Sequence, residues 1–141
     1  MNVFIATTPE DRAACYAVRE AVFMGEQGVS EAEEWDGLDE ACTHFLAGDA
    51  ANPAGCARLL PKGDAAKVQR VAVMPSHRGT GLGRQIMLAI LDHARDAGFT
   101  LVILDSQTHA VPFYERLGFT AHGPEFDDAG IPHRSMRLSL I

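Results

Sequence analysis

Cysteine is scarce and scattered in this chain of 141 residues, which holds only Cys15, Cys42 and Cys56 and no C-x-x-C pair. An odd number of widely spaced cysteines argues against a disulfide framework, and the missing paired spacing argues against a zinc site. We therefore expect reduced thiols buried as small hydrophobic residues in a cytoplasmic protein, and we expect no metal.

Long apolar runs are also missing. No segment approaches the length of a membrane span, and the first residues lack the basic-then-apolar pattern of a secretory signal. We therefore expect no membrane association. Hydrophobic residues still make up 47% of the chain and charged residues 22%, which is typical of a globular protein with its own core. At this length we expect a single domain over residues 1–141.

Positive charge is absent from one long stretch. Between Arg19 and Arg58 there is no Lys or Arg, and the stretch carries nine carboxylates: Glu20, Glu26, Glu31, Glu33, Glu34, Asp36, Asp39, Glu40 and Asp49. Most of the basic residues follow it. The net charge of −7 argues against nucleic acid as the main partner. The acidic stretch either attracts a cationic ligand or keeps the surface soluble.

The pattern of apolar and turn residues predicts alternating strands and helices. Thr7 or Thr8 caps a first helix that ends near Met24 and buries a stripe of Ala14, Val18, Ala21 and Val22. For residues 30–40 a short helical turn and a mobile loop remain alternatives. The other predicted elements are strands at 2–6, 43–48, 55–60, 68–74, 100–105, 119–121 and 133–140, helices at 82–97 and 109–117, and an exposed loop at 123–132.

The stretch 68–97 reads as a strand, a glycine-rich turn and an amphipathic helix. The apolar run 100–105 is typical of a strand buried on both faces, which predicts a parallel pair with 68–74. Gly79, Gly81 and Gly83 stand where the helix begins, so unpaired N–H donors and the positive end of the helix dipole favour an anion, best a phosphate. Arg78 and Arg84 flank this turn and would add charge-assisted bonds. The alternative is that the glycines serve turn geometry alone.

Two motifs carry a resemblance to a known family. The run Arg78-Gly79-Thr80-Gly81-Leu82-Gly83 fits the R/Q-x-x-G-x-G/A signature of the GNAT (GCN5-related) N-acetyltransferases, whereas nucleoside-triphosphate and dinucleotide loops fit worse. The run Ala110 to Phe119 is similar to the A-x-x-F/L-Y-x-x-x-G-F segment of that family. Residues 55–121 carry the resemblance best. The first forty or so residues resemble the ElaA-like and YjcF-like subgroup, through Arg19, Val22, Phe23, Glu26, Gln27, Glu34, Asp36, Asp39 and His44.

The resemblance implies an α/β fold, with a mixed and mostly antiparallel sheet, a central parallel pair and helices on both faces. It also implies acetyl-CoA as the acetyl donor. Residues Arg78 to Arg84 would hold the pyrophosphate. The splayed strand at Val71, Ala72 and Val73 would pair with the pantetheine arm and offer an oxyanion donor near Ala72 or Val73. Phe113 would also contact CoA. Gln107 stands where the family commonly has Asn, so its CoA contact keeps the amide on a longer side chain.

The chemistry of acetyl transfer assigns further residues. A phenol stays protonated near neutrality, so Tyr114, at the family's position, would protonate the departing thiolate; the alternative is a core aromatic. The resemblance makes Glu26 the expected base, because it stands in the Glu-Gln pair at the end of the first helix, which borders the acceptor site in the family. Burial beside Phe23 would raise its pKa toward the working range, and the alternative is a solvated carboxylate. His44 and His109 are the other candidates. Gln27 and Arg19 border the expected acceptor side, where Arg19 would serve as an ion-pair partner of Glu26 or as a substrate clamp.

These expectations combine into an acetyl-CoA-dependent N-acetyltransferase that acts on a primary amine of a small molecule by direct attack on the thioester. The acidic stretch would then attract a cationic acceptor such as a polyamine, an amino sugar or an amino-group drug, although a peptide or lysine acceptor stays open. The alternatives are a non-catalytic acyl-CoA-binding or regulatory module of the same fold, and a nucleotide-binding domain. Dimers are common in the family, so a homodimer is possible.

Overall fold

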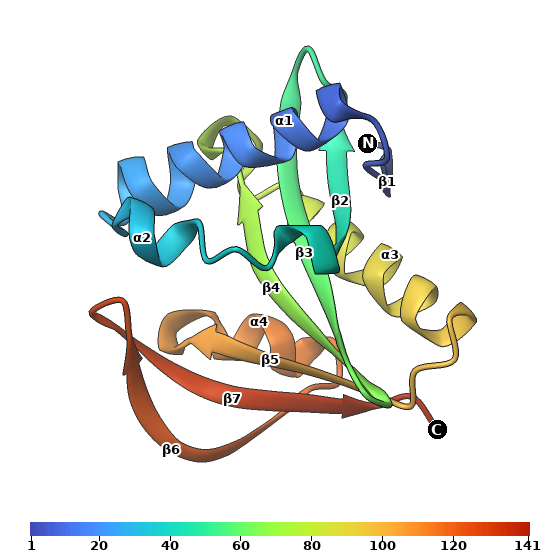
Figure 1. The fold of residues 1–141 in the computed structure, drawn as a ribbon. Coiled ribbons are helices and arrows are strands. Elements are labelled where there is room, and N and C mark those ends of the chain that lie inside the picture. The colour runs from blue at the N-terminus through green and yellow to red at the C-terminus, as the bar shows by residue number, and fades with distance from the viewer.

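The computed structural model describes residues 1–141 and contains one seven-stranded sheet in the order β1-β2-β3-β4-β5-β7-β6 (Figure 1). All neighbouring strands are antiparallel except β4 and β5, which are parallel. This confirms the predicted mixed and mostly antiparallel sheet with one parallel pair. The strands are β1 (Val3–Ile5), β2 (Thr43–Gly48), β3 (Pro53–Lys62), β4 (Ala65–Val73), β5 (Leu101–Gln107), β6 (Thr120–Asp128) and β7 (Ile131–Ser139).

The parallel pair separates halfway along its length. β4 pairs with β5 from Ala65 opposite Leu101 only as far as Val68 opposite Leu104. Beyond that point Arg70 takes the left-handed backbone conformation, with φ at 57°, beside a register shift between β3 and β4. Such a β-bulge bends and twists its strand. The carboxyl halves of β4 and β5 therefore diverge and leave two strand edges facing each other across a gap in the ladder.

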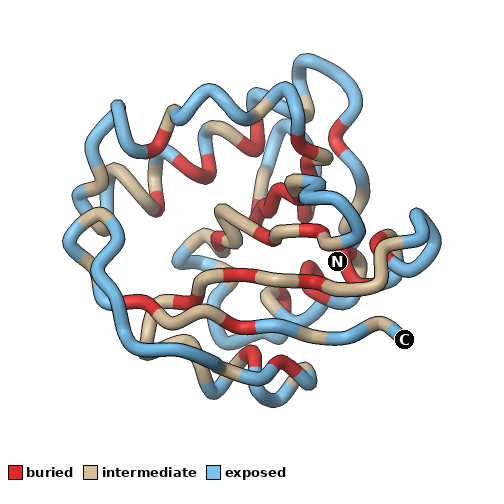
Figure 2. Tube along the Cα trace, turned by 60° about the horizontal axis from the view of Figure 1, so that its bottom comes forward, coloured by how far each residue is buried: buried red, intermediate tan, exposed pale blue.

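Helices cover both faces of the sheet, as predicted. One face carries α1 (Pro9–Arg19), which packs on β2, β3 and β4 with Val18 inward. The other carries α3 (Leu82–Asp96) and α4 (Val111–Arg116), with Ile86 and Ile90 fully buried. Figure 2 shows that burial is concentrated on the central strands and on the inward sides of the helices. None of the helices combines the length and the apolar composition that a membrane span requires.

The first helix begins as predicted and continues further than predicted. The Thr8 hydroxyl oxygen accepts a hydrogen bond from the Asp11 N–H at 3.1 Å and caps α1. After Arg19 the chain continues as the π-helical segment η1 (Glu20–Glu26), two residues beyond the expected end. In the predicted stripe Ala14, Val18 and Val22 are buried, while Ala21 is only partly buried. π-Helical turns are rare in proteins, and those that occur are often found at functional sites. The last residue of this one, Glu26, lines the pocket described below.

The acidic residues 30–40 contain the short helix α2 (Glu31–Glu34), whose first turn is capped by the Ser30 hydroxyl. A single 3-10 turn, η2 (Asp39–Ala41), follows before β2. The helical turn is therefore the better of the two alternatives that the sequence left open.

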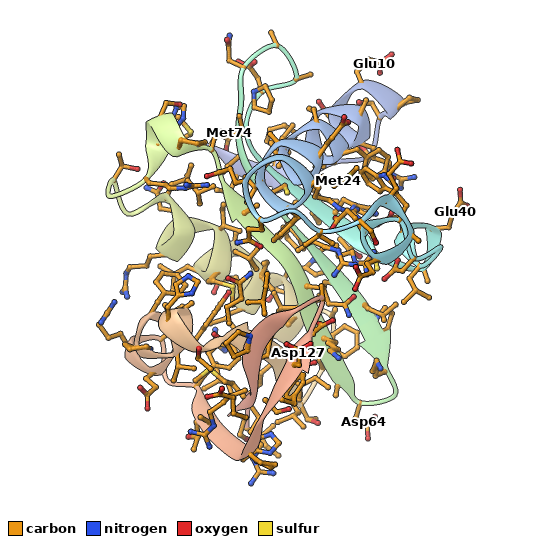
Figure 3. The ribbon with its side chains drawn as sticks, turned by 90° about the vertical axis from the view of Figure 1, so that its left-hand side faces the viewer. Glu10, Met24, Glu40, Asp64, Met74 and Asp127 are labelled. Atoms are coloured by element: carbon orange, nitrogen blue, oxygen red, sulfur yellow. The ribbon has the colours of Figure 1, made fainter.

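In Figure 3 Met24 in η1 and Met74 after β4 lie toward one end of the molecule, and Asp64 marks the opposite end of β4.

Two predictions near the C-terminus are wrong. Residues 123–132, expected to form an exposed loop, belong mainly to the β6–β7 hairpin, whose two-residue turn is Ala129-Gly130 with φ of 54° and 77°. A register shift between His122 and Phe126 accommodates the glycine and proline that suggested a loop. β5 is likewise not buried on both faces, since Val102, Leu104 and Ser106 are buried and the residues between them are only partly buried. Its second face borders a pocket.

Candidate functional site

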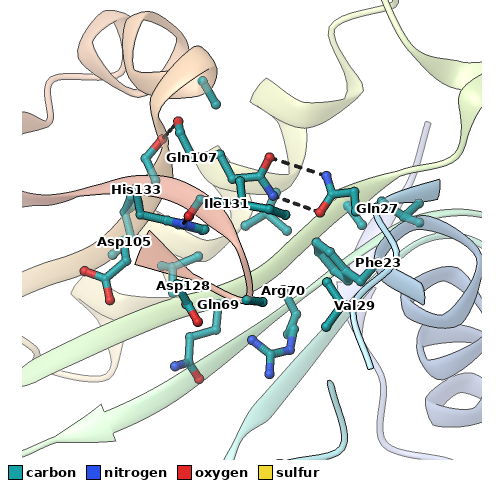
Figure 4. A pocket seen from close by; sticks show the side chains of 18 of the residues that line it. Phe23, Gln27, Val29, Gln69, Arg70, Asp105, Gln107, Asp128, Ile131 and His133 are labelled. Carbon is teal, nitrogen blue, oxygen red and sulfur yellow. Dashed lines mark hydrogen bonds between the residues drawn. The ribbon is translucent and has the colours of Figure 1, made fainter. Parts of the chain in front are cut away.

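A pocket of about 460 Å³ opens where β4 and β5 diverge (Figure 4). Its walls come from η1 and the residues after it, from α2, from the separated halves of β4 and β5, from α4 and from the tip of the β6–β7 hairpin. Segments far apart in the sequence thus meet at one cavity. Of the residues predicted for the site, the following line it: Glu26, Gln27, Val71, Ala72, Val73, Arg78, Gln107, His109 and Tyr114.

The glycine-rich turn precedes α3 and its glycines have two different tasks. Gly79 and Gly81 have φ of 75° and 84°, the left-handed region, and nothing lies within 4 Å of a Cβ added at either. They shape the backbone and leave its N–H groups accessible. Gly83 lies inside the helix, where an added Cβ would sit 3.4 Å from Phe113 Cζ, so it allows close packing against α4. The motif therefore serves turn geometry and packing, and its exposed backbone leaves room for an anion.

Gly81 is the N-cap of α3, and no side chain caps the first turn of this helix of 15 residues. The first N–H groups of a helix lack intrahelical partners and carry the positive end of its dipole. The Thr80 hydroxyl donates to the His77 carbonyl oxygen at 2.6 Å and fixes the turn. Arg84 is exposed on the first turn. The arrangement suits an anion approaching from solvent.

Arg78 connects this turn to the end of η1. Its Nη1 and Nη2 donate to the two carboxylate oxygens of Glu26 at 2.9 and 2.6 Å, and its Nε donates to the Val73 carbonyl oxygen at 3.0 Å. The expectation that burial raises the pKa of Glu26 is wrong. The carboxylate is 38% exposed, and the Arg78 hydrogen bonds lower its pKa. Glu26 also pairs with Arg78 rather than with Arg19.

Tyr114 lies at the border of the core and the pocket. Phe113 and Phe119 pack edge-on against its ring, with centroids 4.9 and 5.9 Å away. Burial raises the pKa of its phenol to about 12, and no neighbouring charge opposes this effect. Tyr114 is thus a core aromatic that also lines the pocket, and its hydroxyl keeps its proton throughout the neutral range.

Gln27 and Gln107 join opposite walls of the pocket. The Gln107 Nε2 donates to Gln27 Oε1 at 2.9 Å, and the Gln27 Nε2 donates back to Gln107 Oε1 at 3.4 Å (Figure 4). The two residues are 80 positions apart in the sequence. This amide pair connects the residue after η1 with the last residue of β5. The helix α4, which contains Tyr114, follows β5 in the sequence.

Arg19 and His44 do not belong to the site, which corrects two of the predicted roles. Arg19 is 1% exposed, and its Nε and Nη1 donate to Glu34 at 2.7 Å and to Asp39 at 2.6 Å. His44 is buried, which lowers its pKa, and its Nε2 lies 2.8 Å from the Asp39 carbonyl oxygen. Neither residue lines the pocket. Arg19 joins the acidic stretch to α1, and His44 joins it to β2.

Part of the negative charge of the acidic stretch is neutralised by ion pairs with arginines of the same protein. Arg58 is fully buried, and its Nη2 and Nη1 contact Asp36 at 2.6 Å and Asp39 at 2.9 Å. Arg70 contacts Glu34 at 3.1 Å. The Arg58 hydrogen bonds lower the pKa of Asp36 to about 2. Asp36, Asp39 and Glu34 are thus paired with arginines, so their charge is largely neutralised within the protein. Glu33, in contrast, lines the pocket and makes no ion pair.

Sequence reasoning missed the contribution of the β6–β7 hairpin. Four of its residues line the pocket: Asp128, Ala129, Ile131 and His133. The alternation of Ile131, His133 and Ser135 along β7 was a usable signal, because residues two apart share a face of a strand. Predicting residues 123–132 as a loop concealed it. Asp105 of β5, which pairs with Lys67 at 3.0 Å, was missed too.

Comparisons with known proteins agree with the fold and the motifs. The family model described as "Acetyltransferase (GNAT) domain" matches residues 8–140. The uncharacterized N-acetyltransferase YjcF of Bacillus subtilis is 40% identical over 96% of this chain and 98% of its own length. Among solved structures, an acyl-CoA N-acyltransferase from Pseudomonas aeruginosa has a TM-score of 0.86 at 29% identity, covering 96% of this chain and 97% of its own.

A second solved structure, that of Escherichia coli ElaA, has a TM-score of 0.85 at 25% identity. It covers 96% of this chain and 97% of its own. The relatives are therefore similar over nearly their whole length, and the similarity reaches well beyond the two motifs. The chain belongs to the GNAT family of acetyltransferases.

Proposed function

We propose that this protein is an acetyl-CoA-dependent N-acetyltransferase that acetylates a primary amine of a small molecule by direct attack on the thioester. One observation carries the proposal: a single pocket joins the edge of β4, which leads into the glycine-rich turn, to the buried phenol of Tyr114. We take residues 1–141 as one domain, which the family match over residues 8–140 supports.

The donor site follows from the backbone. N–H groups around Gly79 and Gly81, with the start of α3, would bind the pyrophosphate of acetyl-CoA. The edge of β4 from Val71 to Val73, no longer paired with β5, would add the pantetheine arm as a further strand. A β4 N–H near Ala72 or Val73 would then donate to the oxygen on which charge develops.

Tyr114 would complete the chemistry as the general acid. The departing thiolate needs a proton, and a phenol with a pKa of about 12 is fully protonated when the reaction runs near neutrality. Its aromatic neighbours hold the ring in place, so the hydroxyl does not have to be ordered for each turnover. A module that only binds acyl-CoA would have no need of this buried hydroxyl in the pocket.

The acceptor side favours a cationic small molecule. Glu33 on α2 and Asp128 on β6 line the pocket without pairing to a Lys or Arg, whereas its other carboxylates are paired. Two unpaired carboxylates beside an apolar wall that includes Phe23 and Val29 would attract an amine in its protonated form. Amino sugars, polyamines and amino-group drugs share this chemistry.

Binding and turnover test the proposal separately. Thermal unfolding with acetyl-CoA, CoA, ATP and NAD should show the largest stabilisation with acetyl-CoA, about 2.7 kcal/mol at a hundredfold excess over Kd. Release of CoA thiol should then follow with at least one of spermidine, glucosamine, kanamycin or a lysine peptide. Stabilisation without thiol release would indicate a non-catalytic acyl-CoA-binding module. Stronger stabilisation by ATP or NAD would indicate a nucleotide-binding domain.

A further inference from the structure

His133 lies on β7 and is 9% exposed, with its ring at the pocket (Figure 4). Its Nδ1 is 2.7 Å from the carbonyl oxygen of Ile131. A carbonyl oxygen can only accept a hydrogen bond, so Nδ1 carries the proton and donates it. In the neutral ring Nε2 is then left as an unprotonated nitrogen with a free lone pair. The backbone therefore selects the tautomer in which Nε2 can accept a proton.

The His133 ring stacks on an aromatic ring of the neighbouring strand β6. Gln107 of β5 and Phe126 of β6 are its cross-strand partners, and the Phe126 ring stacks on it with centroids 6.0 Å apart and an interplanar angle of 27°. Gln107 is itself fixed by its amide pair with Gln27. An imidazole that is positioned by stacking and fixed in one tautomer by a backbone carbonyl oxygen is suited to proton transfer at a defined nitrogen.

Other ionisable groups at the pocket are already engaged or lack such support. Glu26 accepts two hydrogen bonds from Arg78, and Asp105 pairs with Lys67 and accepts from the Ser135 hydroxyl at 3.0 Å. His109 is exposed and makes no hydrogen bond that would fix its ring. The ionisable groups that share the pocket with His133 are Glu26, Glu33, Glu34, Lys67, Arg70, Arg78, Asp105, His109, Tyr114 and Asp128.

We propose that Nε2 of His133 is the proton acceptor for the attacking amine, an assignment that rests on the acetyltransferase function proposed above. An acceptor that binds as an ammonium first releases one proton to solvent, and the neutral amine nitrogen then attacks the thioester carbonyl carbon, forming the C–N bond. The nitrogen then gives up its proton to Nε2, and the C–S bond breaks. Its electron pair leaves on sulfur, which takes the proton of the Tyr114 hydroxyl. The products are an amide and CoA thiol, and exchange with solvent returns His133 and Tyr114 to their starting protonation.

His133→Asn tests this role without removing the structural hydrogen bond. The side-chain amide of Asn can still donate to the Ile131 carbonyl oxygen, but it offers no basic nitrogen. With the fastest amine of the panel above, we expect kcat/KM to fall about a hundredfold or more. The Kd of CoA should stay unchanged.

His122→Asn is the matched control, because His122 is an exposed imidazole of the same hairpin that does not line the pocket. This variant should keep the wild-type kcat/KM. A second readout needs no turnover: the nitrogen shifts of ¹⁵N-labelled histidine should show that the neutral His133 ring carries its proton on Nδ1. A neutral ring protonated on Nε2 would overturn the inference, and so would a His133→Asn variant that keeps the wild-type kcat/KM. A wild-type protein that releases no thiol with any amine would overturn the proposed function itself.

Discussion

Arg78 and Glu26 form a bidentate ion pair between the glycine-rich turn and the end of η1, with Nη–Oε distances of 2.9 and 2.6 Å. The guanidinium also donates to the Val73 carbonyl oxygen, so its three nitrogens are all engaged. A pyrophosphate bound at the turn would compete with the Glu26 carboxylate for this cation. If the donor binds there, the pair would weaken its binding; the pair also favours the ionised form of Glu26.

Glu26→Gln should tighten CoA binding. The change removes a negative charge beside the phosphate site and frees the Arg78 guanidinium, so we expect the Kd of CoA to fall a few-fold at low salt and less at high salt. The value of kcat should change by less than about twofold, because the ionised carboxylate is paired rather than poised to take a proton. Calorimetric titration with CoA and steady-state kinetics measure the two effects.

Glu20→Gln is the control for this prediction, since Glu20 is exposed at the start of η1 and makes no ion pair. It should leave the affinity for CoA as it is. If Glu26→Gln instead lowered kcat by a hundredfold with CoA affinity unchanged, Glu26 would be the base and the ion pair would open during turnover.

Gly81→Ala should weaken donor binding. An alanine at φ of 84° costs about 1 kcal/mol in backbone strain, and the space around the added Cβ is open, so the protein should still fold. Relief of the strain would turn the N–H groups at the start of α3 away from the phosphate site. We expect the Kd of CoA to rise at least about tenfold, as measured by calorimetric titration.

Gly98→Ala provides a matched comparison at the other end of α3. Gly98 has φ of 88° and equally open space, so the loss of stability should be similar. Its distance from the glycine-rich turn should leave CoA binding intact. Equal losses of affinity in the two variants would mean that Gly81 acts on stability alone.

The strand–turn–helix at 68–97 could be predicted because its signals are local. Alternating β-branched residues, closely spaced glycines and a helical apolar stripe all lie within thirty or so positions, and α3 begins at the predicted Leu82. The predicted end of the strand was also accurate to one residue, although β4 begins three residues earlier than expected. Backbone signals of this kind need no knowledge of the rest of the chain.

The partners of charged residues could not be predicted in the same way. Arg19 contacts carboxylates 15 and 20 positions away, and Arg78 contacts one that is 52 positions away. The sequence displays an excess of carboxylates but contains no signal for which of them turns inward. The hairpin residues were missed for a related reason: a register shift absorbs Gly123 and Pro124, so the strand continues where the residue types suggest a loop.

Glu34→Gln should destabilise the fold. Glu34 is buried, and its Oε2 lies 2.7 Å from Arg19 Nε and 3.1 Å from Arg70 Nε. Loss of its negative charge therefore removes one ion-pair partner from each of two guanidinium groups. Removing one member of a buried ion pair costs about 3 kcal/mol. The free energy of unfolding in urea measures this loss. Glu40→Gln, at an exposed carboxylate without an ion pair, should change stability by less than about 0.5 kcal/mol.

Tyr114→Phe should separate the chemistry of the phenol from its packing. The ring remains between Phe113 and Phe119, so the fold and the Kd of CoA should be retained. Without the hydroxyl the leaving thiolate has no proton donor, and kcat should fall about a hundredfold or more. Unchanged thiol release with the best amine would mean that Tyr114 is a core aromatic only.

The raised pKa of Tyr114 gives the same variant a second signature. The folded phenol ionises near pH 12 and the unfolded one near pH 10, so the protonated form is favoured by folding. This contribution to stability is complete below pH 10 and is lost as the pH rises from 10 to 12. The Tyr114→Phe variant has no phenol to ionise, so its stability does not fall for this reason. The stability of the variant, measured in urea relative to wild type, should therefore improve between pH 9 and pH 11, and a constant difference would show that the phenol is not desolvated.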